Sequence, residues 1–158
     1  MSELNDHEKN LITNVETHGW FATHVFDPDG NDPNFTYSTG FAKTLNVPEF
    51  IIFGLDQELM HDMLWEVFRQ LESGAVPEDG MRWHDLIEGF HCISKKASHP
   101  DLHKEYTCSA NWFWRREGHT TPLDVYQIVW PGAQQGLFPW EEGCNEYVIS
   151  QQPQLWKN

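Results

Sequence analysis

Nine histidines stand among 158 residues, and their spacing decides whether acid–base chemistry is available. His18 and His24 are six residues apart, whereas His91 and His119 lie far along the chain. Acid–base catalysis needs one group that accepts a proton and another that donates one. If the chain is an enzyme, we expect a hydrolase acting on a phosphodiester. Its catalytic residues would come from His18, His24, His91 and His119, acting with Asp or Glu.

The known catalytic and metal-binding motifs are incomplete or absent. His119-x-Thr121 matches one half of a two-histidine phosphoesterase signature, and no second copy follows. His61-Asp62 and His84-Asp85 resemble the His-Asp pairs of metal-dependent phosphohydrolases, whose ligands lie on a helical bundle that this sequence does not predict. The chain lacks the Cys and His spacing of a structural zinc site and the GxSxG, P-loop and GxGxxG motifs. We therefore expect no metal and no cofactor.

Aromatic side chains suggest a second kind of chemistry, because eight Trp exceed what a core of this size demands. Residues 112–116 read Trp-Phe-Trp-Arg-Arg, which combines rings that stack with guanidinium groups that pair with phosphate. Residues 36–40 read Thr-Tyr-Ser-Thr-Gly and offer hydroxyl groups beside bare backbone. Ligand contacts are expected at Trp112, Trp114, Arg115, Arg116, Tyr37, Ser38 and Thr39. Core packing, a solvated Arg pair and an ordinary strand end are the alternatives.

The formal net charge is −14, with 24 acidic and 10 basic residues. This balance opposes binding to a phosphate backbone, so duplex nucleic acid is not an expected partner. Residues 1–80 contain 15 acids and only three bases, whereas the second half is nearly balanced. A basic protein would suit the first half. An anionic ligand would draw on the bases of the second half, which include Arg82, Lys95, Lys96, Lys104, Arg115 and Arg116.

The start of the chain, MSELNDHE, has no apolar leader, and no stretch approaches the roughly 18 apolar residues of a membrane span. Cys92, Cys108 and Cys144 are odd in number and lack CxxC spacing, which is typical of reduced thiols. We expect a cytoplasmic protein without a membrane partner. Its length fits a single domain over residues 1–158. The sequence leaves its oligomeric state open.

Hydrophobic spacing predicts helices over residues 3–16 and about 56–73, and a partly helical segment over 101–116. Alternating or β-branched runs predict strands over residues 20–26, 35–41, 50–55, 90–94 and 124–130. The Gly- and Pro-rich residues 131–140 predict an ordered loop. Because the elements do not alternate as βαβ units, the predicted class is α+β. We expect a mixed or mainly antiparallel sheet, with one long amphipathic helix at about 56–73 and shorter helices packed on it.

Several segments together resemble a bacterial family called domain of unknown function 4262. They are HGW at 18–20, FTYSTGF at 35–41, PEFIIFGL at 48–55, QIVWP at 127–131 and GLFPW at 136–140. The resemblance runs from about residue 16 to 152. It implies a stand-alone bacterial or phage domain, and it brings no activity, cofactor or catalytic residue.

The leading hypothesis is a non-catalytic binding module. It would recognise a small anionic, nucleotide-like ligand or a basic protein partner, in the manner of an inhibitor, decoy or immunity protein in bacterial or phage conflict. The histidine-dependent phosphodiester hydrolase is the alternative, with Arg115 or Arg116 holding phosphate. Convergence of two histidines and a carboxylate in a cleft would favour the enzyme.

Overall fold

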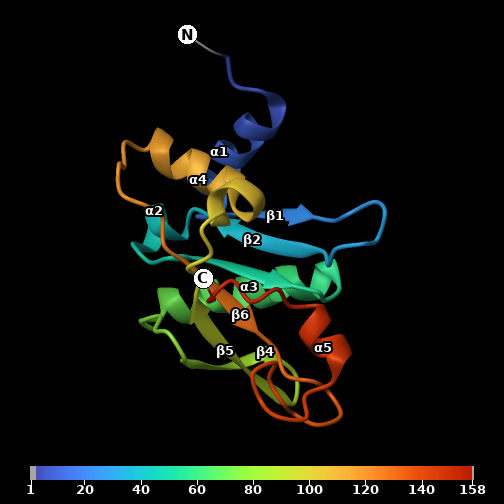
Figure 1. Ribbon diagram of the computed structural model, residues 1–158. Coiled ribbons are helices and arrows are strands. Elements are labelled where there is room, and N and C mark those ends of the chain that lie inside the picture. The colour runs from blue at the N-terminus through green and yellow to red at the C-terminus, as the bar shows by residue number, and fades with distance from the viewer. Residues whose placement is uncertain (1–2, 158) are drawn as a thin grey trace.

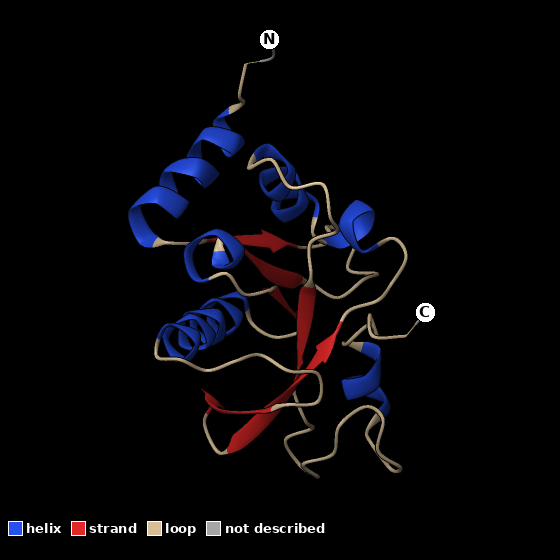
Figure 2. Ribbon diagram, turned by 90° about the vertical axis from the view of Figure 1, so that its left-hand side faces the viewer, coloured by secondary structure: helices blue, strands red, loops and turns tan. Residues whose placement is uncertain are grey.

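The structure is a computed structural model that describes residues 3–157, and it is built on one six-stranded sheet with the strand order β1-β2-β3-β6-β5-β4 (Figure 1). Helices lie on both sides of the strands (Figure 2). The strands are β1 (Phe21–Val25), β2 (Phe35–Thr39), β3 (Glu49–Phe53), β4 (Arg82–Ile87), β5 (Phe90–Lys96) and β6 (Val125–Val129). The helices are α1 (Asp6–His18), α2 (Phe41–Leu45), α3 (Gln57–Glu72), η1 (Leu102–Tyr106), α4 (Cys108–Arg116) and α5 (Glu146–Ser150).

The predicted α+β class, mixed sheet and long helix are confirmed. β3 and β6 pair in parallel, and the four other strand pairs are antiparallel. β6 enters the sheet between β3 and β5 because the chain first crosses one face as α3 and forms the β4–β5 hairpin. No helix among residues 3–157 combines the length and the apolar composition needed to cross a membrane.

Both faces of the central strand β3 are buried. Phe50 and Ile52 pack under α3 in one cluster, which also holds Trp83, Trp130 and the apolar side of α3. Ile51 and Phe53 pack in a second cluster, under η1, α4 and the C-terminal tail. Alternate residues of a strand point to opposite faces, so this run of apolar residues specifies a strand covered on two sides.

Several elements differ from the sequence prediction. The second strand ends at Thr39 rather than at residue 41, because Gly40 adopts a φ of 111° and the chain turns into the short helix α2. β4 begins at Arg82 and occupies a stretch in which no strand was predicted, and α5 was also missed. Asp56 directly precedes α3, and its side chain makes no capping hydrogen bond.

The carboxylate of Glu49 lies where β2, α2 and β3 meet, and the residue is 2% exposed. Ser38 Oγ donates to one of its oxygens at 2.8 Å. Three backbone N–H groups at the start of α2 donate at 3.0–3.1 Å, those of Gly40, Phe41 and Ala42. Such N–H groups have no partner within their own helix. Glu49 therefore stabilises the start of α2 from a later position in the chain.

Burial raises the pKa of Glu49 from 4.5 to about 7, while the four donors oppose that rise. Between these two pH values the native state holds a proton that the unfolded chain releases. The resulting stabilisation is complete below about pH 4.5 and is lost as the pH rises to about 7. Glu49 therefore makes the fold less stable at neutral pH than at mildly acidic pH.

We predict that Glu49→Gln removes this pH dependence. Between pH 4.5 and pH 7.5, the free energy of unfolding of the unaltered protein should fall by about 3 kcal/mol more than that of the variant. The variant should be less stable overall, because its amide NH₂ faces backbone donors. Urea denaturation at both pH values provides the measurement. Parallel pH profiles would mean that Glu49 ionises normally in the fold.

We predict that Gly54→Ala, at the end of β3, is more damaging than Gly80→Ala. Both glycines have positive φ, at 77° and 81°. A Cβ at Gly54 would lie 2.6 Å from the carbonyl oxygen of Gln151 in the C-terminal tail, whereas a Cβ at Gly80 would have no neighbour within 4 Å. Denaturant unfolding should show a loss of about 3 kcal/mol for Gly54→Ala and about 1 kcal/mol for the control. Equal losses would show that the tail does not pack there.

Candidate functional site

The β4–β5 hairpin divides its side chains between the core and an exposed face. Trp83 of β4 and Cys92 of β5 are register partners, and both are buried under α3. Arg82 and His84 flank Trp83 and are exposed, so they point to the face away from α3. His91 belongs to the same face, because it precedes the inward-facing Cys92.

A bulge in β4 sets the position of His84. The pairing register shifts between Trp83 and Ile87, and Asp85 within this stretch has a φ of 68°. A positive φ at a residue other than Gly costs about 1 kcal/mol. The bulge bends the strand and breaks the regular pairing that a partner strand would need.

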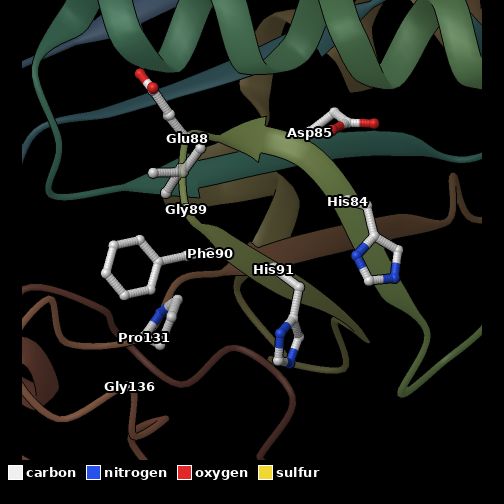
Figure 3. A pocket seen from close by; sticks show the side chains of 9 residues that line it. His84, Asp85, Glu88, Gly89, Phe90, His91, Pro131 and Gly136 are labelled. Carbon is white, nitrogen blue, oxygen red and sulfur yellow. The ribbon is translucent and has the colours of Figure 1, made fainter.

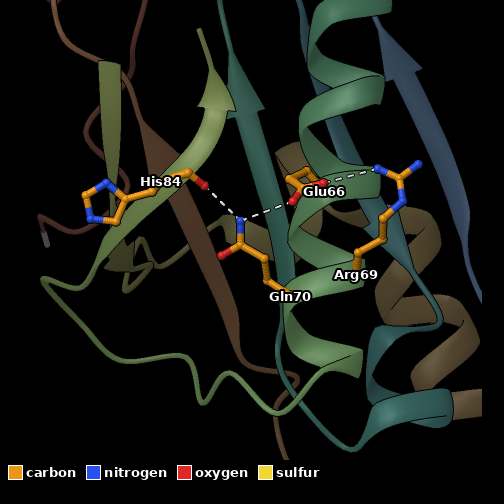
Figure 4. A network of polar contacts seen from close by, with 4 residues as sticks. All are labelled: Glu66, Arg69, Gln70 and His84. Atoms are coloured by element: carbon orange, nitrogen blue, oxygen red, sulfur yellow. Dashed lines mark hydrogen bonds and ion pairs between the residues drawn. The ribbon is translucent and has the colours of Figure 1, made fainter. Parts of the chain in front are cut away.

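A polar network from α3 holds the backbone of β4 at this bulge (Figure 4). Gln70 Nε2 donates to the carbonyl oxygen of His84 at 2.8 Å. The same amide lies 3.5 Å from Glu66 Oε1, and Glu66 is paired with Arg69 at 3.2 Å. In Figure 4 the imidazole of His84 points away from α3. The backbone of His84 is thus tied to the helix while its ring stays free.

A hollow of about 690 Å³ lies between the β4–β5 hairpin and the loop that carries Pro131 and Gly136. The imidazole rings of His84 and His91 are 6.1 Å apart between centroids, and both point toward that loop (Figure 3). Glu88, at the hairpin turn, points away from both rings. The hollow therefore presents two neighbouring imidazoles at its wall.

Rings continue from His91 along the C-terminal tail. Phe138 lies 5.5 Å from His91 between centroids, and Trp140 stacks on Phe138 at 5.1 Å with an angle of 6° between the rings. Trp156 meets Trp140 edge-on at 5.6 Å. Trp140 is 41% exposed. This row of rings gives the face a surface on which a planar ligand can stack.

Two cations accompany these rings. Lys95 Nζ lies 5.1 Å from the centroid of Trp140, and Arg82 projects beside His84. Neither Arg82 nor Lys95 forms an ion pair within residues 3–157. We call Arg82, His84, His91, Lys95 and Trp140 the hairpin face. It joins unpaired positive charge to stacked rings in an acidic chain.

The expected cluster on residues 112–116 does not line one hollow. Trp112 packs toward α1, with the Arg116 guanidinium 5.9 Å above its ring. Trp114 instead stacks on His119 at 3.5 Å beside a different hollow of about 380 Å³. Residues two apart on a helix lie about 200° apart around its axis, which separates the two indoles. Arg115, like Arg116, is exposed and lines neither wall of that hollow.

The hydroxyl residues of β2 are buried rather than open to a ligand. Tyr37 accepts a hydrogen bond from the backbone N–H of Ser109, and burial raises its pKa. The Ser38 hydroxyl donates its hydrogen bond to Glu49, and Thr39 is fully buried. Their assignment as ligand contacts remains a prediction, and this location gives it no support.

The four candidate catalytic histidines fall on three separate hollows. His18 and His24 line one of about 490 Å³, together with His61. His91 lies on the hairpin face, and His119 lies beside Trp114. The hydrogen bonds of histidine side chains within residues 3–157 go to hydroxyl or backbone groups rather than to a carboxylate. Across the same residues, Asp, Glu, His and Cys form no group of three or more able to hold a metal ion.

Sequence reasoning missed His84 and Trp140 as site residues, although it included Arg82 and Lys95 among possible anion contacts. The available signal was the alternation of Arg82, Trp83 and His84, which matches a strand with one buried face. The bulge at Asp85 interrupts that alternation after three residues and hides the strand.

The motif at residues 18–20 lies at the end of α1 and the connection to β1, and the motif at 35–41 spans β2 and the turn into α2. The motifs at 48–55, 127–131 and 136–140 lie on β3, on β6 and in the loop beside the hollow. A comparison with protein families matches residues 14–145 to one family. No curated protein and no solved structure matches the chain. Because the match covers most of the sequence, the chain belongs to the family described as domain of unknown function (DUF4262).

Proposed function

We propose that this protein is a non-catalytic binding module that recognises a small anionic, nucleotide-like ligand at the hairpin face. The observation that carries the proposal is the presence of two cations without an ion pair among residues 3–157, Arg82 and Lys95. They lie on the face of the β4–β5 hairpin that carries His84 and His91, and the Lys95 ammonium lies 5.1 Å from the centroid of Trp140. Guanidinium and ammonium groups pair with phosphate, and exposed rings bind planar bases. The cations come from the β4–β5 hairpin and the stacked rings from the C-terminal tail, and Lys95 and Trp140 bring the two together.

The positions of the ring of Trp140 and of the two cations give the proposed ligand one orientation on this face. Its base stacks on the exposed indole of Trp140 in place of the Lys95 ammonium, which lies over that ring in the free protein. The released ammonium then pairs with the phosphate, together with the Arg82 guanidinium. His84 and His91 contribute ring N–H groups from the wall of the hollow.

Binding is favoured over the hydrolase alternative by the surroundings of the histidines. A base and an acid are oriented by hydrogen-bonded partners in histidine-dependent enzymes. Neither His84 nor His91 has a hydrogen-bonded side-chain partner among residues 3–157, and Glu88 points away. We place the protein in the cytoplasm, since its three cysteines are free thiols. A binding module of this kind suits a role as an inhibitor, decoy or immunity protein.

We predict that the protein binds ADP and that Lys95→Ala or Arg82→Ala weakens binding about tenfold, because each removes a charge-assisted contact with phosphate. Lys104→Ala removes the same charge from an exposed position on η1 and should leave the affinity unchanged. Isothermal titration calorimetry measures all four proteins. Adenosine and pyrophosphate, titrated separately, should each bind more weakly than ADP.

Two outcomes would contradict the proposal. If the titration with millimolar ADP releases or absorbs no heat, the proposal of a nucleotide-like ligand is wrong. Release of AMP and phosphate from ADP, or cleavage of a dinucleotide, would show that the site performs histidine-dependent hydrolysis instead.

A further inference from the structure

β1 forms an open edge of the sheet at the opposite end from the hairpin face. All five of its residues pair in register with β2, from Phe21 with Thr39 to Val25 with Phe35, without a bulge. No other strand within residues 3–157 pairs with β1. In an antiparallel edge strand, alternate residues turn their N–H and C=O groups outward. These groups are available to another strand.

The two edge strands of the sheet differ in how far they are protected against pairing with another strand. The β4 edge carries a bulge, a residue with positive φ and a side-chain hydrogen bond from Gln70, all of which oppose strand addition. β1 contains no Pro, Lys or Gly and no bulge. Proteins normally protect such an edge against pairing. The unprotected edge is therefore the one suited to a partner.

A hollow of about 490 Å³ lies along the β1 edge. Phe21 and Ala22 both line it although they point to opposite faces of the sheet, so the hollow reaches around the strand. His18 of α1 forms one wall, and His61 and Trp65 of α3 form the other. The edge therefore lies at the base of a groove between two helices, one on each face of the sheet.

Rings make up much of the α3 wall. The imidazoles of His24 and His61 are 5.7 Å apart between centroids, and His24 is held by a 2.8 Å hydrogen bond between its Nδ1 and Thr36 Oγ1. Trp65 meets Trp20 edge-on at 5.2 Å. The Arg69 guanidinium already lies 5.5 Å from the centroid of Trp65, so this indole attracts a guanidinium within the chain itself.

Acidic side chains lie near the groove, although no carboxylate is among the residues that line the hollow. Asp62 follows His61 on α3 and is exposed. The loop after β1 adds three more acids, Asp27, Asp29 and Asp32. Residues 1–32 contain seven acids and a single base, Lys9. Arg69 is the cation next to Trp65, and it is paired with Glu66.

We propose that the β1 edge is the docking site for an extended basic segment of a partner protein, which adds to the sheet as a seventh strand. Main-chain hydrogen bonds along β1 provide the affinity, and alternate side chains enter the groove. The side chain that faces Trp65 and His61 is an arginine, whose flat guanidinium stacks on rings and is weakly hydrated. A second copy of this chain would bring the same acids to the same edge, so charge disfavours self-pairing.

This docking site is independent of the hairpin face, and its test uses a fluorescein-labelled octapeptide of alternating Arg and Val at about 0.15 M salt. A second peptide has the same sequence but carries N-methyl groups on alternate backbone amides, which removes strand hydrogen bonds and keeps every charge. Fluorescence anisotropy should show that the unmodified peptide binds and that N-methylation weakens binding about tenfold or more.

Two charge reversals on α3 provide matched protein variants. Asp62→Lys, beside His61, should weaken binding about tenfold, because it reverses a charge near the groove. Glu72→Lys makes the same change at the far end of the helix and should alter binding less than threefold. Hydrogen exchange with bound peptide should slow at residues 21–25.

Three results would overturn the inference. The unmodified peptide fails to bind, the two peptides bind equally well, or the protein alone forms a dimer that Asp62→Lys disrupts. Equal binding would mean that general charge attraction suffices, and the dimer would mean that a second copy occupies the edge.

Discussion

The burial of β3 on both faces governs the rest of the molecule. Residues 50–53 are apolar without interruption, so helices and the C-terminal tail must cover the sheet on two sides. That demand places Trp83, Trp130 and Tyr37 in the interior, where they stabilise the fold. Exposed rings lie at several places where this coverage ends, among them Phe26 after β1, Trp140 in the tail and Tyr147 on α5.

The coverage also separates the charges. The acid-rich first half supplies α1, β1 and α3, whereas the hairpin and the tail come from the balanced second half. The sheet thus has an acidic end with an open strand edge and a far end with cations beside stacked rings. Two proposed recognition surfaces therefore lie at opposite edges of one sheet, and neither requires a catalytic group.

Much of the fold follows from local sequence, because the spacing of apolar residues and the turn-forming residues determine helices, strands and turns over short stretches of chain. Leu59 to Leu71 forms the apolar stripe of α3, and Gly19 ends α1 in the left-handed conformation. The candidate site was harder to predict from the sequence, because it depends on contacts between segments that are far apart in the chain. Trp112 and Trp114 are neighbours in sequence but lie on different sides of α4. His84 and His91 are neighbours only because a hairpin with a bulge brings them together. The role of Glu49 could not be predicted either, because its carboxylate accepts hydrogen bonds from α2, a helix that the sequence did not predict.

The most direct test of the binding account is a two-dimensional NMR titration of histidine side chains and Trp indole N–H groups with ADP. The account predicts that the imidazole signals of His84 and His91 and the indole signal of Trp140 shift together and saturate at one affinity. Signals from His18, His24, His119 and Trp114 should stay in place. Shifts confined to Trp114 and His119, or no shift at any residue, would contradict it.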